Sequence, residues 1–178
     1  MTAGADDTVR LWGARRCDDV FAAQVDELFR RCERRVGKYL VQMVGDRGLA
    51  EDLLQDVFHD AFRAREQLQA VRNADAWLFG MARNRALNAL RKRRRLQAAL
   101  ARLARRAAPE VPDHELVALR DLLERHLAPE DRSLLILRYL HGFDALELGA
   151  MTGRSAEAVR QRLARARAKL IAAATEED

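Results

Sequence analysis

Three segments of the chain carry polar side chains at helical spacing, in patterns suited to binding a protein or a polyanion. In the first segment, Asp52, Asp56 and Asp60 recur every four residues, with Gln55 and His59 between them. Residues four apart share one face of a helix, so these five residues form one acidic stripe. Like charges at this spacing destabilise a helix by a few tenths of a kcal/mol. The stripe is therefore either a solvated face or a docking surface for a basic partner.

The second segment follows Ser155 and has the character of a DNA-reading helix. Val159, Leu163, Ala166 and Leu170 make a narrow apolar stripe, and Glu157, Gln161 and Arg165 lie opposite it. Glutamine can pair with adenine, arginine with guanine, and glutamate can accept from cytosine. An ordinary amphipathic helix is the alternative, but the preceding short turn with Gly153 favours a helix-turn-helix.

The third segment runs from Asn73 into a basic run. Trp77, Asn84, Asn88, Arg91 and Arg95 follow one side of the predicted helix. Tryptophan, asparagine and arginine can stack on single-stranded bases and hydrogen-bond to them. Trp77 has a second interpretation, as a core residue packed on the first helix.

No pattern in the sequence is typical of an enzyme. A Ser/His/Asp arrangement and a glycine-rich phosphate loop are both missing, and His59, His114, His126 and His141 are scattered. Cys17 and Cys32 form no metal-binding spacing and are expected to be reduced thiols. We therefore expect no catalytic residue, no cofactor, no metal and no small-molecule substrate.

The elements that position these segments are expected to be helices. The 178 residues are 49% hydrophobic and 33% charged, with scarce Val, Ile and Thr. A net charge of +5 suits a polyanionic partner. No apolar run reaches membrane-spanning length and the N-terminus lacks a signal peptide's apolar core, so a cytoplasmic protein is expected.

The chain divides into two helical lobes. Pro109 and Pro112 disfavour helix in the residues before them, which places a flexible linker at 96–113. The first lobe, 18–95, is predicted to hold three helices, at 19–44, at 49–68 and from Asn73 or Asp75 into the basic run. The second lobe, 114–173, is predicted to hold four short helices, at 113–127, 129–141, 144–152 and 155–173. The fold class is all-α, and the two lobes are expected to separate in the free chain.

Capping signals support the helix boundaries in the second lobe. Asp144 and Glu147 have capping-box spacing, and Ser155 can cap the last helix.

Residues 50–64, 76–95 and 127–170 together resemble bacterial RNA polymerase sigma factors. The likeness is to the small extracytoplasmic-function (ECF) type, which keeps only regions 2 and 4. It implies that residues 18–95 form region 2 and residues 114–173 form region 4. Residues 96–113 would form a linker that passes through the polymerase. It also implies binding to core RNA polymerase, promoter recognition, DNA opening and an anti-sigma partner.

The resemblance assigns a role to each polar face. The acidic stripe, Asp52, Gln55, Asp56, His59 and Asp60, would dock on the polymerase clamp. Contacts to the −10 element would come from Arg72, Asn73, Trp77, Asn84, Asn88, Arg91, Lys92 and Arg95. Contacts to the −35 element would come from Arg154, Ser155, Glu157, Ala158, Arg160, Gln161, Arg162 and Arg165.

Two departures from the family pattern concern the DNA-reading parts. The loop 68–75, which would capture a flipped base of the −10 element, has no aromatic residue. Gly149 stands where the family usually has alanine, at a helix-propensity cost of up to about 1 kcal/mol. A helix-turn-helix repressor that works without polymerase is the alternative function, although the acidic stripe would have no use in it.

Overall fold

The computed structural model describes residues 6–101 and 122–176. Its helices are α1 (Asp6–Val44), α2 (Arg47–Arg63), the short 3-10 helix η1 (Arg65–Ala70), α3 (Ala74–Ala101), α5 (Pro129–Tyr139), α6 (Ala145–Thr152) and α7 (Ala156–Glu176). Residues 122–126 are also helical, and no strand occurs in the described ranges. The prediction of an all-α chain is confirmed.

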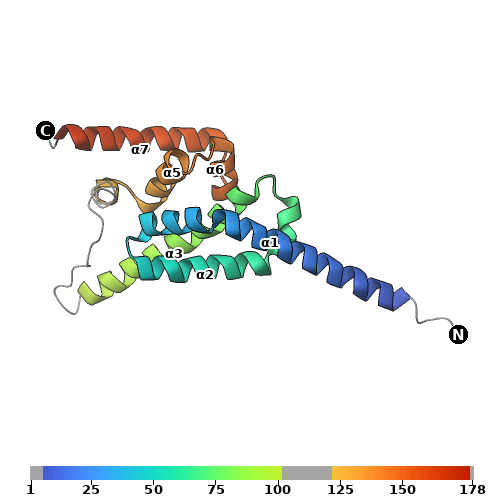
Figure 1. Cartoon of the computed structure of the whole chain (residues 1–178). Coiled ribbons are helices and arrows are strands. Elements are labelled where there is room, and N and C mark those ends of the chain that lie inside the picture. Colours follow the sequence, from blue (N-terminus) through green and yellow to red (C-terminus); the bar gives the residue numbers. More distant parts are fainter. Residues whose placement is uncertain (1–5, 102–121, 177–178) are drawn as a thin grey trace.

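Helices α1, α2 and α3 form the first lobe, which we call the region 2 lobe (Figure 1). Gly45, with φ of 72°, ends α1, and the Asp46 carboxylate caps α2 by accepting from the Leu49 amide at 2.9 Å. The apolar face of α2 is buried at Leu53, Val57 and Ala61. The cap thus sets where α2 begins, and burial of its apolar face leaves its polar face toward solvent.

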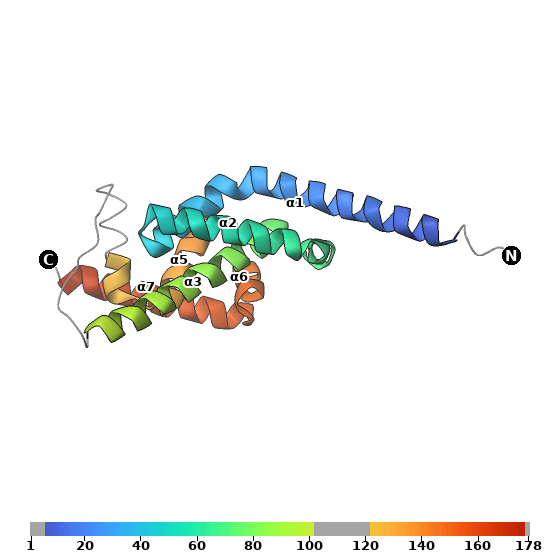
Figure 2. The ribbon, with the colours of Figure 1, turned by 90° about the horizontal axis from the view of Figure 1, so that it is seen from below.

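Three boundaries differ from the prediction by five residues or more. Helix α1 begins at Asp6 rather than near Asp19, and its N-terminal part extends well beyond the bundle (Figure 2). Helix α2 ends at Arg63, and η1 occupies the residues predicted as its last turn. Helix α3 continues to Ala101, so the first six residues of the predicted linker are helical; the arginine run has no helix breaker before Pro109. The rest of the linker and most of the predicted helix 113–127 lie outside the described residues.

The described part of the second lobe, residues 122–176, is the region 4 lobe, and α6 and α7 form its helix-turn-helix. Asp144 and Glu147 form the predicted capping box of α6, and the Ser155 hydroxyl accepts from the Ala158 amide at 3.1 Å to cap α7. Gly153 joins the helices in the left-handed conformation, with φ of 66°. A Cβ on Gly149 would lie 2.6 Å from the Arg154 carbonyl oxygen, so the tight turn requires glycine there.

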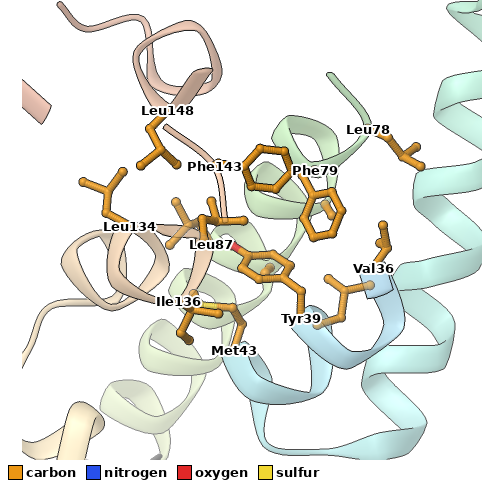
Figure 3. Packing of buried hydrophobic residues seen from close by; sticks show 14 of the residues in the cluster. Val36, Tyr39, Met43, Leu78, Phe79, Leu87, Leu134, Ile136, Phe143 and Leu148 are labelled. Atoms are coloured by element: carbon orange, nitrogen blue, oxygen red, sulfur yellow. The ribbon is translucent and has the colours of Figure 1, made fainter. Parts of the chain in front are cut away.

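The two lobes share one hydrophobic core, which contradicts the expectation that they separate. Buried residues of α1 and α3, among them Met43 and Phe79, belong to the same cluster as Leu134 and Phe143 of the region 4 lobe (Figure 3). The Phe79 and Phe143 rings meet edge to face, 4.9 Å apart. Burying this apolar surface stabilises the docked arrangement whatever the length of the linker.

Candidate nucleic-acid and protein interface

Helix α2 presents the acidic stripe to solvent. Asp52, Gln55, Asp56 and His59 are exposed and Asp60 is partly buried, while Leu53 and Val57 on the opposite side are buried. The stripe is thus positioned by the apolar face of α2, which packs on α1 and α3.

Arg85 of α3 divides the stripe into two parts. Its guanidinium donates to Asp60 at 2.5 and 2.7 Å and to Asp56 at 3.2 Å. The hydrogen bond to Asp60 raises the pKa of Arg85. The negative charges of Asp56 and Asp60 are therefore shared with α3, whereas Asp52 extends the stripe beyond this cluster.

Asn73, a member of the predicted −10 surface, already makes two side-chain hydrogen bonds within the chain. Its side-chain oxygen accepts from the Ala76 amide at 3.1 Å, which caps α3, and its Nδ2 donates to Glu147 of α6 at 2.5 Å. Asp75, two residues on, is held by Arg31 and Arg35 at 2.6 and 2.9 Å. Burial opposes ionisation of Asp75, but these arginines lower its pKa overall.

The rest of the −10 surface follows α3. Asn84, Asn88, Arg91, Lys92 and Arg95 are exposed, as is Arg72 in the preceding loop. Trp77 is half-buried and packs against the core, so its ring is only partly available for stacking. Arg91 donates to Asn88 at 3.0 Å and to Glu130 of α5 at 3.3 Å.

The predicted −35 surface lies on α7 and the turn before it. Arg154, Ser155, Glu157, Arg160, Gln161 and Arg165 are exposed, and Ala158 and Arg162 are half-buried. Glu157 accepts from Arg160 at 2.8 Å and from Gln161 at 3.3 Å. Arg162 donates to Asp131 at the start of α5. Lys169, which the predicted set omits, lines a hollow of about 300 Å³ with Arg154, Gln161 and Arg165.

A groove of about 1200 Å³ lies between the two predicted DNA surfaces. Trp77, Met81 and Asn84 of α3 form one wall, and Met151 and Arg154 from the helix-turn-helix form the other. No pattern in the sequence indicates this groove, because its two walls come from residues more than sixty positions apart.

Within the described ranges no helix is long and apolar enough to cross a membrane, and no group of three or more His, Cys, Asp or Glu side chains could hold a metal ion.

Both lobes match known families. The sigma-70 region 2 family matches residues 28–96, and the sigma-70 region 4 family matches residues 116–170. RNA polymerase sigma factor CarQ of Myxococcus xanthus is 35% identical over 151 residues, covering 82% of this chain and 86% of the relative. ECF RNA polymerase sigma factor SigC of Mycobacterium tuberculosis (strain CDC 1551) is 31% identical over 146 residues, covering 78% and 77%.

Two solved structures share the fold. CnrH, in complex with the cytosolic domain of CnrY, is 27% identical and has a TM-score of 0.69, covering 90% of this chain and 99% of that one. RpoE of Bartonella quintana, in complex with the anti-sigma factor NepR, is 23% identical with a TM-score of 0.68, covering 82% and 92%; this likeness shows the fold alone. Two helical lobes in this order, each matched to its sigma-70 region, establish that the chain belongs to the sigma-70 family, as a sigma factor of the ECF type.

Proposed function

We propose that the chain binds core RNA polymerase through the acidic stripe of α2 and gives the polymerase its promoter specificity. The exposed stripe carries this proposal. It lies on a chain of net charge +5, and it faces away from the core although its charges repel one another along the helix. Arg85 offsets part of that repulsion at Asp56 and Asp60, and a basic protein surface would relieve the rest. A DNA-binding repressor would have no use for the stripe.

Promoter reading is divided between α3 and α7. Asn84, Asn88, Lys92 and Arg95 of α3 would contact bases or phosphates of the −10 element, together with Arg72, Asn73, Trp77 and Arg91. Gln161 and Arg165 of α7 would meet base edges of the −35 element, and Arg154 and Arg160 would meet phosphates. Ser155 and Ala158 form the cap of α7, and an N-terminal cap directs free backbone amides toward phosphate.

The proposed activity requires no catalytic chemistry in this chain, and it takes place where polymerase and chromosomal DNA meet, in the cytoplasm. An anti-sigma partner is part of the proposal, because two proteins of similar fold were solved in complexes, CnrH with the cytosolic domain of CnrY and RpoE with the anti-sigma factor NepR.

Reversing the charge of Asp52 tests the docking surface. Asp52 is exposed and lies apart from the Arg85 cluster, so Asp52→Arg leaves the α2–α3 ion pairs intact. A like charge placed against a basic partner costs several kcal/mol, so affinity for core polymerase should fall more than about 10-fold. Run-off transcription should fall with it.

Glu51→Arg is the matched control, since it makes the same charge change on the neighbouring, exposed residue. Glu51 faces away from the stripe, into a groove between α1 and α2 that Arg34 and Lys38 also line. Circular dichroism should show unchanged helix content for both variants. Wild-type affinity of Asp52→Arg for core would contradict the docking assignment. Tight, specific promoter binding by the free chain as a dimer would favour a repressor.

A further inference from the structure

We propose that Arg85 of α3 is an intramolecular competitor of core polymerase. Its guanidinium occupies two of the three aspartates of the acidic stripe, and so lowers the affinity of the chain for the basic surface that docks there. Asp52 is then the aspartate that meets the partner with its full charge. This inference rests on the proposed function of the stripe, and its tests distinguish the two.

Arg85 contacts α2 in the way that an arginine of a partner would. Its Nε and Nη2 both donate to Asp60 Oδ2, at 2.7 and 2.5 Å, and its Nη1 donates to Asp56 Oδ2 at 3.2 Å. Asp56 and Asp60 are one helical turn apart, so one planar guanidinium reaches both. A cation from another protein must share these carboxylate oxygens with Arg85 or displace it.

This cluster lies at the surface. The side chains of Arg85, Asp56 and Asp60 are 38%, 55% and 36% exposed, so a partner can reach all three. Asp52, which is exposed, makes no ion pair within the described part of the chain. The stripe therefore presents one unshared aspartate charge, although it contains three aspartates.

The apolar contacts between α2 and α3 do not depend on Arg85. Both helices bury apolar residues in the same core cluster, including Leu53, Val57, Ala82 and Ala86. Ion pairs between groups this exposed add little to stability, because water screens them and ordering long side chains costs entropy. The larger effect of Arg85 is on the charge that the stripe presents to a partner.

Removing the Arg85 charge should therefore tighten binding to core polymerase. In Arg85→Gln both carboxylates regain their full charge, which raises the rate at which a basic surface associates. Each exposed ion pair of this kind corresponds to about 1.5- to 5-fold in affinity, so losing the two should raise affinity for core about 2- to 10-fold. Circular dichroism should show unchanged helix content.

Salt dependence separates a charge effect from a structural one. Biolayer interferometry of the chain on immobilised core polymerase should show the gain mainly in the association rate. The gain should shrink from about 0.1 M to about 0.5 M ionic strength, because screening shortens the range of the field of the stripe. An effect of altered packing between α2 and α3 would persist at high salt.

Two further variants complete the experiment. Arg85→Lys keeps the charge but lacks the planar fork that spans both carboxylates, so its affinity for core should lie between those of wild type and Arg85→Gln. Arg30→Gln is the matched control, because Arg30 also pairs with two carboxylates, Asp26 and Glu27, but within α1. It removes the same charge away from the stripe and should leave the affinity for core almost unchanged.

Unchanged or weaker core binding by Arg85→Gln would overturn the proposal, and so would an equal gain for Arg30→Gln, which would show a general charge effect. If Arg85→Gln loses its helix content, Arg85→Lys takes its place: affinity above wild type is expected, and affinity equal to or below wild type overturns the proposal. Loss of binding in Asp52→Arg without a gain in Arg85→Gln refutes the competition alone. Wild-type binding by Asp52→Arg refutes the proposed function instead.

Discussion

Replacing Gly149 by alanine should destabilise the helix-turn-helix although alanine is the better helix former. Alanine in a helix interior is favoured over glycine by about 1 kcal/mol. At this position its Cβ would lie 2.6 Å from the Arg154 carbonyl oxygen, a backbone atom of the turn that cannot rotate away. Overpacking of this kind costs about 1–3 kcal/mol. The free energy of unfolding should therefore be unchanged or fall by up to about 2 kcal/mol.

Gly48→Ala is the matched control for this substitution. Gly48 is an exposed residue in the first turn of α2, and a Cβ there would lie 3.5 Å from the Asp46 carboxylate, an ordinary contact. Gly48→Ala should raise the free energy of unfolding by up to about 1 kcal/mol. The free energies of unfolding of the two variants, measured by urea denaturation, should therefore differ by about 1–3 kcal/mol. Because Arg154 precedes the cap of α7, Gly149→Ala should also lower −35 selectivity in run-off assays. Equal stabilisation by both substitutions would refute the steric reasoning.

Two further predictions concern α7 and the interface. Gln161→Ala should weaken base preference at one or two positions of the −35 element by about 1–3 kcal/mol, measured by competition binding of promoters to the holoenzyme. An equal loss of affinity for every promoter would show that Gln161 does not read bases. Burial, followed by the charges of Arg35 and Lys38, lowers the pKa of His141 to about 4. The unfolded chain takes up this proton near pH 6.5 and the folded chain does not, so stability should fall by about 2 kcal/mol between pH 7 and pH 5. His141→Gln should flatten that part of the pH dependence in urea denaturation, and an unchanged slope would show that another group titrates.

The helix boundaries that could be predicted are those set by neighbouring residues. Asp144 and Ser155 cap the helices that follow them, as predicted, because a cap needs only a side chain and a backbone amide two or three positions away. The exposed face of α2 could be predicted for a similar reason, since helical periodicity alone separates Asp52 and Asp56 from Leu53 and Val57.

Docking of the lobes could not be predicted, because its contacts join residues far apart in the sequence. In the sequence, Arg132 and Ser133 are polar residues near the start of a predicted helix and would be expected at the surface. In the structure both are buried against the region 2 lobe. Periodicity shows that a face is apolar but does not identify what covers it. The contacts that Asn73 and Arg91 make with Glu147 and Glu130 could not be predicted for the same reason, since these carboxylates belong to the other lobe.

The polar contacts between the two lobes have a consequence for the stability of the docked arrangement. When the lobes separate, water can replace the partners of the Tyr39 and Ser133 hydroxyls and of the Arg132 guanidinium, so much of the hydrogen-bond energy is recovered in solution. An apolar interface of equal size offers no such compensation. These three side chains thus favour one docked arrangement of the lobes while adding less to its stability than apolar side chains of equal size would.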